Sequence, residues 1–102
     1  MSEHVLIVRS IIADPEKRAK FNTWAETNFP QFCLEFGAKI GRRSWSKTDP
    51  AVHNSVYIFA SEEAYQKAVD EKVPAVKALV DTEWPDVHRT REVFELTQQV
   101  IA

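Results

Sequence analysis

Two short apolar stretches decide the fold, His4–Ala13 (HVLIVRSIIA) and Ser55–Ala60 (SVYIFA). Both are rich in β-branched and aromatic residues, a composition that favours strands. Successive side chains of a strand point to opposite faces of its sheet, and in these two stretches both faces are largely apolar. We therefore expect a sheet that has to be covered on both of its faces.

A helix is predicted directly after the first stretch. Asp14-Pro15 supplies an N-cap and a first helical residue. The apolar residues that follow are spaced three or four apart, which predicts one buried helix face. Pro30 is expected to end or kink this helix. A second short helical piece, Pro30–Phe36, is then expected to stop at Gly37 in a left-handed cap.

The rest of the chain continues the alternation of strands and helices. Ala38–Lys47 is predicted to be a second strand, joined through the polar segment Thr48–Asn54 to the strand at Ser55–Ala60. Ser61 suits the N-cap of the next helix, and a further helix is expected over Pro74–Trp84. Val87–Val100 alternates as a long fourth strand.

The element order β-α-β-β-α-β predicts one domain over residues 1–102, of the α+β class, with a ferredoxin-like, four-stranded antiparallel sheet. Helices cover only one face of such a sheet, yet its first and third strands are apolar on both. The same face of a second copy is the economical cover. We therefore expect a homodimer whose two sheets form an α+β barrel.

Charge and composition exclude several classes of function. The 102 residues carry 13 Lys and Arg against 15 Asp and Glu, a formal charge of −2, so we expect neither nucleic-acid nor membrane binding. The lone Cys33 and the absence of zinc-type Cys/His spacing predict no metal site. With only two glycines there is no Gly-rich phosphate loop, and we expect no cofactor. No signal-peptide pattern is present, so a cytoplasmic location is expected.

Several motifs resemble those of the dimeric α+β barrel superfamily, which includes the antibiotic-biosynthesis monooxygenases and EthD-like proteins. The resemblance spans nearly the whole chain. It implies a dimeric barrel and a range of activities: cofactor-free oxygenation, isomerisation, polyketide cyclisation and haem degradation. The motifs are Phe21-Asn22-Thr23-Trp24, Phe36-Gly37-Ala38 before a strand with Arg43 and Trp45, Phe59-Ala60-Ser61-Glu62-Glu63-Ala64-Tyr65, Trp84-Pro85 and Arg89-Thr90-Arg91-Glu92.

One position departs from this resemblance. Many EthD-like sequences have a His-x-Pro near the end of the first helix, with the histidine as a candidate proton-transfer residue. Here the matching stretch is Asn28-Phe29-Pro30. An amide does not titrate, but it can orient a substrate carbonyl or hydroxyl by hydrogen bonds.

Candidate site residues follow from residue type and position. Tyr57, His88 and Asn28 are the candidate catalytic residues, because they can donate a proton or polarise a substrate oxygen. A second set of aromatic and cationic side chains is predicted to bind substrate. This set comprises Trp24, Phe32, Phe36, Trp45, Arg43 and Arg91. Plain core packing of the aromatic residues, and ion pairing of the arginines, are the alternatives.

Two functions remain open from sequence. The first is a small cofactor-independent enzyme that acts on a hydrophobic, aromatic or polyketide-like small molecule. The second is a non-catalytic ligand-binding or stress-associated dimer, which the amide at Asn28 favours. A haem-degrading variant is a third, weaker hypothesis. Resemblance of fold alone does not select among these reactions.

Overall fold

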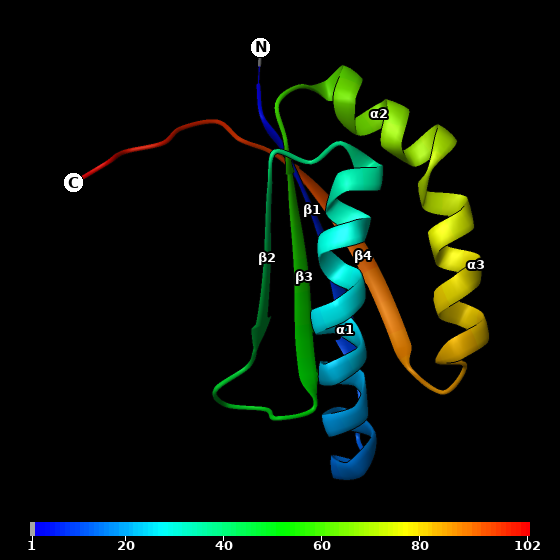
Figure 1. Cartoon of the computed structure of the whole chain (residues 1–102). Coiled ribbons are helices and arrows are strands. Elements are labelled where there is room, and N and C mark those ends of the chain that lie inside the picture. Colours follow the sequence, from blue (N-terminus) through cyan, green and yellow to red (C-terminus); the bar gives the residue numbers. More distant parts are fainter. Residues whose placement is uncertain (1) are drawn as a thin grey trace.

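The computed structural model describes residues 2–102 as a four-stranded antiparallel sheet with helices on one face (Figure 1). The strand order is β2-β3-β1-β4, so the ferredoxin-like fold predicted from sequence is confirmed. Within residues 2–102 no helix is long and apolar enough to cross a membrane. In chain order the elements are β1 (His4–Ile11), α1 (Pro15–Phe36), β2 (Ile40–Trp45), β3 (Val52–Phe59), α2 (Glu62–Glu71), α3 (Val73–Glu83) and β4 (His88–Glu95).

The strand register divides the sheet into a helix face and an open face. On the helix face Leu6 lies opposite Tyr57, and both pack with residues of α1 and α2. On the open face Ile7 of β1 lies between Val56 of β3 and Glu92 of β4. The open face is largely apolar at its centre. It comprises Val5, Ile7, Arg9, Ile11, Ile40, Arg42, Ser44, Val52, Asn54, Val56, Ile58, His88, Thr90, Glu92 and Phe94.

Two hydrophobic clusters hold the helices on the sheet. The larger joins the fully buried Phe59 and its neighbour Tyr57 to Phe32 and Phe36 of α1. The smaller lies where α1 begins and includes Phe21, around which Trp24, Trp45 and Trp84 gather. Burying a large aromatic side chain stabilises a fold by roughly 1.5–3 kcal/mol. These clusters therefore fix how α1 lies across the helix face.

Pro30 does not end the first helix, so that part of the prediction is wrong. The helix α1 continues through Pro30 to Phe36 and stops at Gly37, whose φ of 70° makes the predicted left-handed cap. A proline in a helix removes one hydrogen bond. Here the buried stripe continues from Phe21 through Phe32 to Phe36, and this packing outweighs the lost bond.

The ends of the strands also differ from the predictions. The strand β3 begins at Val52 rather than Ser55, so His53 lies in a strand and not in a loop. The strand β4 stops at Glu95, because β1 begins at His4 and offers no partner beyond the bond from Leu96 N to Glu3 O. The C-terminal segment that follows extends away from the sheet (Figure 1).

A close approach of α1 to β2 at Gly41 gives a stability prediction. A Cβ added at Gly41 would clash with Cys33 Sγ and lie 3.0 Å from Phe29 Cζ. We expect Gly41→Ala to lower the free energy of unfolding by about 1–3 kcal/mol, as overpacking does. Adding Cys33→Ala in the same chain should recover most of this loss. Urea unfolding of both variants tests this, with Lys20→Ala at an exposed position of α1 as control, and an unchanged midpoint for Gly41→Ala would contradict it.

Candidate functional site

A cavity of about 240 Å³ lies between α1, α3 and the helix face of the sheet. Its walls are mostly aliphatic and aromatic, as in most small-molecule sites. An apolar cavity of about 150 Å³ is enough to hold benzene, so this cavity has room for a somewhat larger ring system. The apolar walls come from Leu6, Val8, Phe21, Trp24, Ala25, Phe29, Phe32, Phe36, Val73, Val76 and Val80.

Polar groups on the sheet enter the cavity in two neighbouring rows of the strand register. In one row Arg91 and Ser55 flank Val8, and in the next Arg89 lies opposite Ser10. Lys77 of α3 lines the same cavity. The cavity therefore combines apolar walls with cationic and hydroxyl groups on the β4 side.

Tyr57 contributes a phenol side chain to the cavity lining. Its side chain is buried, and this burial raises its pKa above the ordinary value of 10, with the nearby Cys33 acting in the same direction and Ser55 against it. Tyr57 therefore stays protonated at neutral pH and can donate a hydrogen bond to a ligand oxygen. It is not placed to act as a base.

Five of the nine predicted site residues line this cavity. Besides Tyr57, they are Trp24, Phe32, Phe36 and Arg91. The structure thus brings the aromatic stripe of α1 and one of the predicted arginines to one place.

Asn28 and His88 lie elsewhere. Asn28 is half-buried on α1, and its Nδ2 donates to Trp24 O at 2.8 Å, one turn earlier in the same helix. The amide nitrogen of Asn28 is therefore bonded within its own helix. His88 is exposed at the first residue of β4, on the open face and therefore on the side of the sheet away from the cavity.

Arg43 and Trp45 belong to a separate polar cluster beside the start of α1. Both donate to Oδ1 of Asn22, Arg43 Nη1 at 3.2 Å and Trp45 Nε1 at 3.0 Å. Arg43 Nη1 also lies 3.1 Å from Nε2 of His53. A guanidinium only donates, so Nε2 of His53 is the acceptor and the proton of the neutral imidazole is on Nδ1.

His53 is a buried histidine of the same cluster. Its side chain is fully buried, with the rings of Phe21 and Trp45 against it. Burial and the neighbouring Arg43 charge lower its pKa from 6.5 to about 4. His53 is therefore neutral at physiological pH and is a structural hydrogen-bond acceptor in the cluster.

Sequence reasoning did not place two groups of the cavity, Lys77 and the valines of α3. In the sequence Lys77 looks like an ordinary solvated residue, and the valines of α3 look like a core stripe. Only the packing of α3 above β4 brings them to the cavity. Arg89 shares a strand face with Arg91, as the alternation in the sequence predicts, and both line the cavity. Among residues 2–102 no three His, Cys, Asp or Glu side chains are grouped so as to hold a metal ion.

Comparison with known proteins finds structures of the same fold, at low sequence identity. No family model and no curated protein matches the chain. A dimeric ferredoxin-like protein from an uncultured marine organism superposes with a TM-score of 0.78 at 9% identity, covering 98% of this chain and 100% of the other. At such identity the similarity establishes a shared fold.

Two further solved structures connect this fold to oxygenases. A candidate antibiotic biosynthesis monooxygenase from Deinococcus radiodurans has a TM-score of 0.73 at 14% identity, with 96% of this chain and 97% of that chain covered. SnoaB, a cofactor-independent oxygenase from Streptomyces nogalater solved as a point mutant, has a TM-score of 0.68 at 14% identity and 98% coverage of both chains. The architecture predicted from the sequence motifs is the architecture of these proteins.

Proposed function

We propose that this chain is a small oxygenase-like enzyme that binds an aromatic molecule in the cavity between α1, α3 and the sheet. The observation that carries the proposal is the 240 Å³ cavity, with apolar walls and with Tyr57, Arg89 and Arg91 in its lining. Pockets for drug-sized ligands measure about 300–1,000 Å³. The smaller volume favours a compound of one or two rings over a larger polyketide.

The cavity residues support chemistry on a phenolic ring. Trp24 and the other aromatic side chains bind the ring and exclude water. Tyr57 donates a hydrogen bond to the ring oxygen, and the Arg89 and Arg91 charges favour its ionised form. An electron-rich phenolate is the form that reacts with dioxygen, so the protein contributes by stabilising that anion in a mostly apolar site.

A direct test uses 1-naphthol and dioxygen with the purified chain. In the proposed reaction one 1-naphthol and one O₂ give one 1,4-naphthoquinone and one water, so oxygen supplies both the oxidant and the new carbonyl oxygen. We expect quinone absorbance and oxygen uptake to rise in proportion to protein. Val76→Trp, which fills the cavity, is the matched control and should abolish both. Quinone formation equal to that of protein-free buffer would contradict the oxygenase proposal.

Tyr57→Phe isolates the contribution of the phenolic hydroxyl. The ring remains in the core and the donor is lost, so we expect the affinity for 1-naphthol to fall about 3- to 10-fold, the effect of one hydrogen bond. Calorimetric titration measures this change. Tyr65→Phe is the control, because Tyr65 packs on Phe59 and is not part of the cavity lining. Equal affinities for the two variants would show that Tyr57 does not contact the ligand.

A second candidate is a ligand-binding protein without catalysis. Its support is that Tyr57 is held protonated and that none of the three histidines lines the cavity. In that case 1-naphthol binds in the calorimeter but is not oxidised. The same two measurements therefore separate the two candidates.

We also propose that a second copy of the chain covers the open face. That face exposes large apolar side chains, with 45% of Phe94, 38% of Ile40 and 36% of Ile11 accessible. The similar marine protein is described as dimeric, which supports a second copy as the cover. Apolar strand centres such as Ile7 and Val56 would then meet their symmetry mates.

A further inference from the structure

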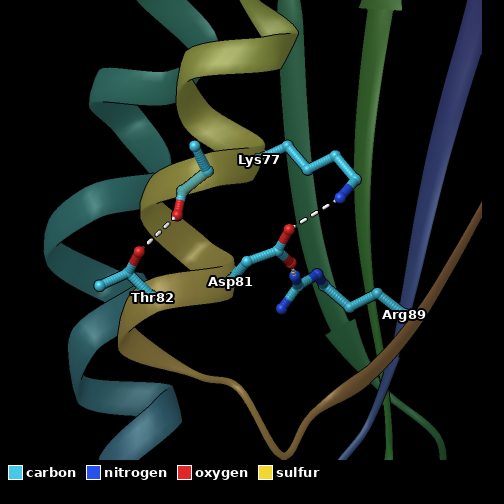
Figure 2. A network of polar contacts seen from close by, with 5 residues as sticks. Lys77, Asp81, Thr82 and Arg89 are labelled. Atoms are coloured by element: carbon cyan, nitrogen blue, oxygen red, sulfur yellow. Dashed lines mark hydrogen bonds and ion pairs between the residues drawn. The ribbon is translucent and has the colours of Figure 1, made fainter.

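A cluster of cations lies on the β4 side of the cavity, with one carboxylate among them. Lys77 Nζ lies 2.7 Å from Asp81 Oδ2, and Arg89 Nη2 donates to the other oxygen of the same carboxylate (Figure 2). Arg91 lines the cavity next to them, and no ion pair of Arg91 is formed within residues 2–102. The cavity lining thus carries three positive side chains, and Asp81 pairs with two of them.

Arg89 is the buried member of this cation cluster, defined as Lys77, Arg89 and Arg91. Only 17% of its side chain is exposed, and within residues 2–102 its Nη1 is buried with no hydrogen-bond partner. A guanidinium has five N–H donors, and a buried donor left unpaired destabilises the structure. Arg89 also lines the cavity, so a ligand carboxylate toward which the guanidinium turns would give Nη1 the partner that it lacks.

Asp81 pairs with two members of the cluster, although its position in the helix is unfavourable for a carboxylate. It lies in the last turn of α3, where the negative end of the helix dipole disfavours a carboxylate, and no basic residue lies in that turn. Its side chain is 45% exposed. Its position is therefore explained by Arg89 and Lys77, and it shows that the cluster accepts a carboxylate.

We propose that the cation cluster binds the carboxylate of an aromatic acid whose ring occupies the apolar part of the cavity. This inference rests on the proposed function, because it specifies the substrate class of the same cavity. The ligand carboxylate bonds to the open donors of Arg89 and to Arg91, while Asp81 keeps its bond to Arg89 Nη2. A planar guanidinium favours the two oxygens of a carboxylate over the single oxygen of a phenol.

The alternative is that these ion pairs only fasten α3 to β4. A purely structural role would change stability when Arg89 is removed, but it would not distinguish an acid from a neutral ligand of the same shape. Selectivity between two matched ligands is therefore the deciding readout. Stability alone is not.

The experiment compares 1-naphthoate with neutral 1-naphthol at pH 7 by calorimetric titration. We expect wild type to bind naphthoate about 10-fold or more tightly than naphthol. Arg89→Met should lose about 10-fold or more in naphthoate affinity and clearly less in affinity for naphthol, which is neutral at pH 7, so the preference for naphthoate should fall. Lys17→Met is the matched control, because Lys17 pairs with Asp86 outside the cavity, and its selectivity should equal that of wild type.

Three results would overturn the inference. If wild type binds naphthol but prefers it to naphthoate, or binds both equally, the substrate class is wrong and the proposed function stands. If Arg89→Met loses both affinities equally while melting like wild type, the cluster does not select the carboxylate. If neither ligand binds, the proposed function fails together with the inference. Arg91→Met, at an exposed side chain that also lines the cavity, decides the same question if Arg89→Met does not fold.

Discussion

Ile7→Asp is expected to convert the proposed dimer into monomers. Ile7 lies at the centre of the open face, between Val56 and Glu92. Because a two-fold interface presents the same patch from both copies, one substitution places two carboxylates in the apolar contact. Each buried, unpaired charge there costs about 2 kcal/mol or more, so the dissociation constant should rise about 100-fold or more.

Light scattering measures this directly, since each chain has a mass of 11.7 kDa. Wild type should have twice the mass of one chain, and Ile7→Asp the mass of one. Leu34→Asp is the control, because Leu34 is an apolar residue of α1 that is 76% exposed and lies outside the open face. A monomeric wild type, or a dimer that survives Ile7→Asp at micromolar concentration, would contradict the proposed assembly.

Acid is expected to destabilise the chain by about 3 kcal/mol through His53 alone. A folded-state pKa of about 4 against 6.5 for the unfolded chain means that the unfolded state binds the proton more tightly between these values. The stability is therefore fully present above about pH 6.5 and is lost as the pH falls toward 4. The value of about 3 kcal/mol follows from 1.36 kcal/mol for each unit of pKa.

Urea unfolding between pH 7.5 and pH 4 measures this effect at one protein concentration. His53→Gln keeps an acceptor for Arg43 and removes the titrating group, so its free energy of unfolding should fall less with acid than that of wild type by about 3 kcal/mol. Parallel curves for wild type and His53→Gln would show that His53 does not carry the acid sensitivity.

The fold could be predicted because its signals are local. The alternation in HVLIVRSIIA, the Asp14 and Ser61 caps and the stop at Gly37 act within a few residues. Pro30 was misjudged because local proline chemistry competes with aromatic packing along the whole of α1. Packing against the sheet is a tertiary effect that a helix-ending rule does not include.

The site was only partly predictable because it depends on contacts between distant segments. The aromatic stripe of α1 predicts one wall of the cavity, and the alternation of Arg89 and Arg91 predicts its cationic edge. The burial of His53 depends on Phe21 and Trp45 closing over it, and the cation cluster depends on α3 lying above β4. Asn28 has a plain role in its own helix that residue type alone did not reveal.

The central claim is that the cavity, and not the open face, is the ligand site. Methyl-detected NMR with 1-naphthol tests it, because aromatic ring currents shift the methyl groups that the ligand contacts. We expect saturable shifts at Leu6, Val8, Val76 and Val80 in the cavity, with Val5, Ile7, Val56 and Ile58 on the open face unchanged. Shifts confined to the open-face methyls, or no saturable shift at any cavity methyl, would contradict the account.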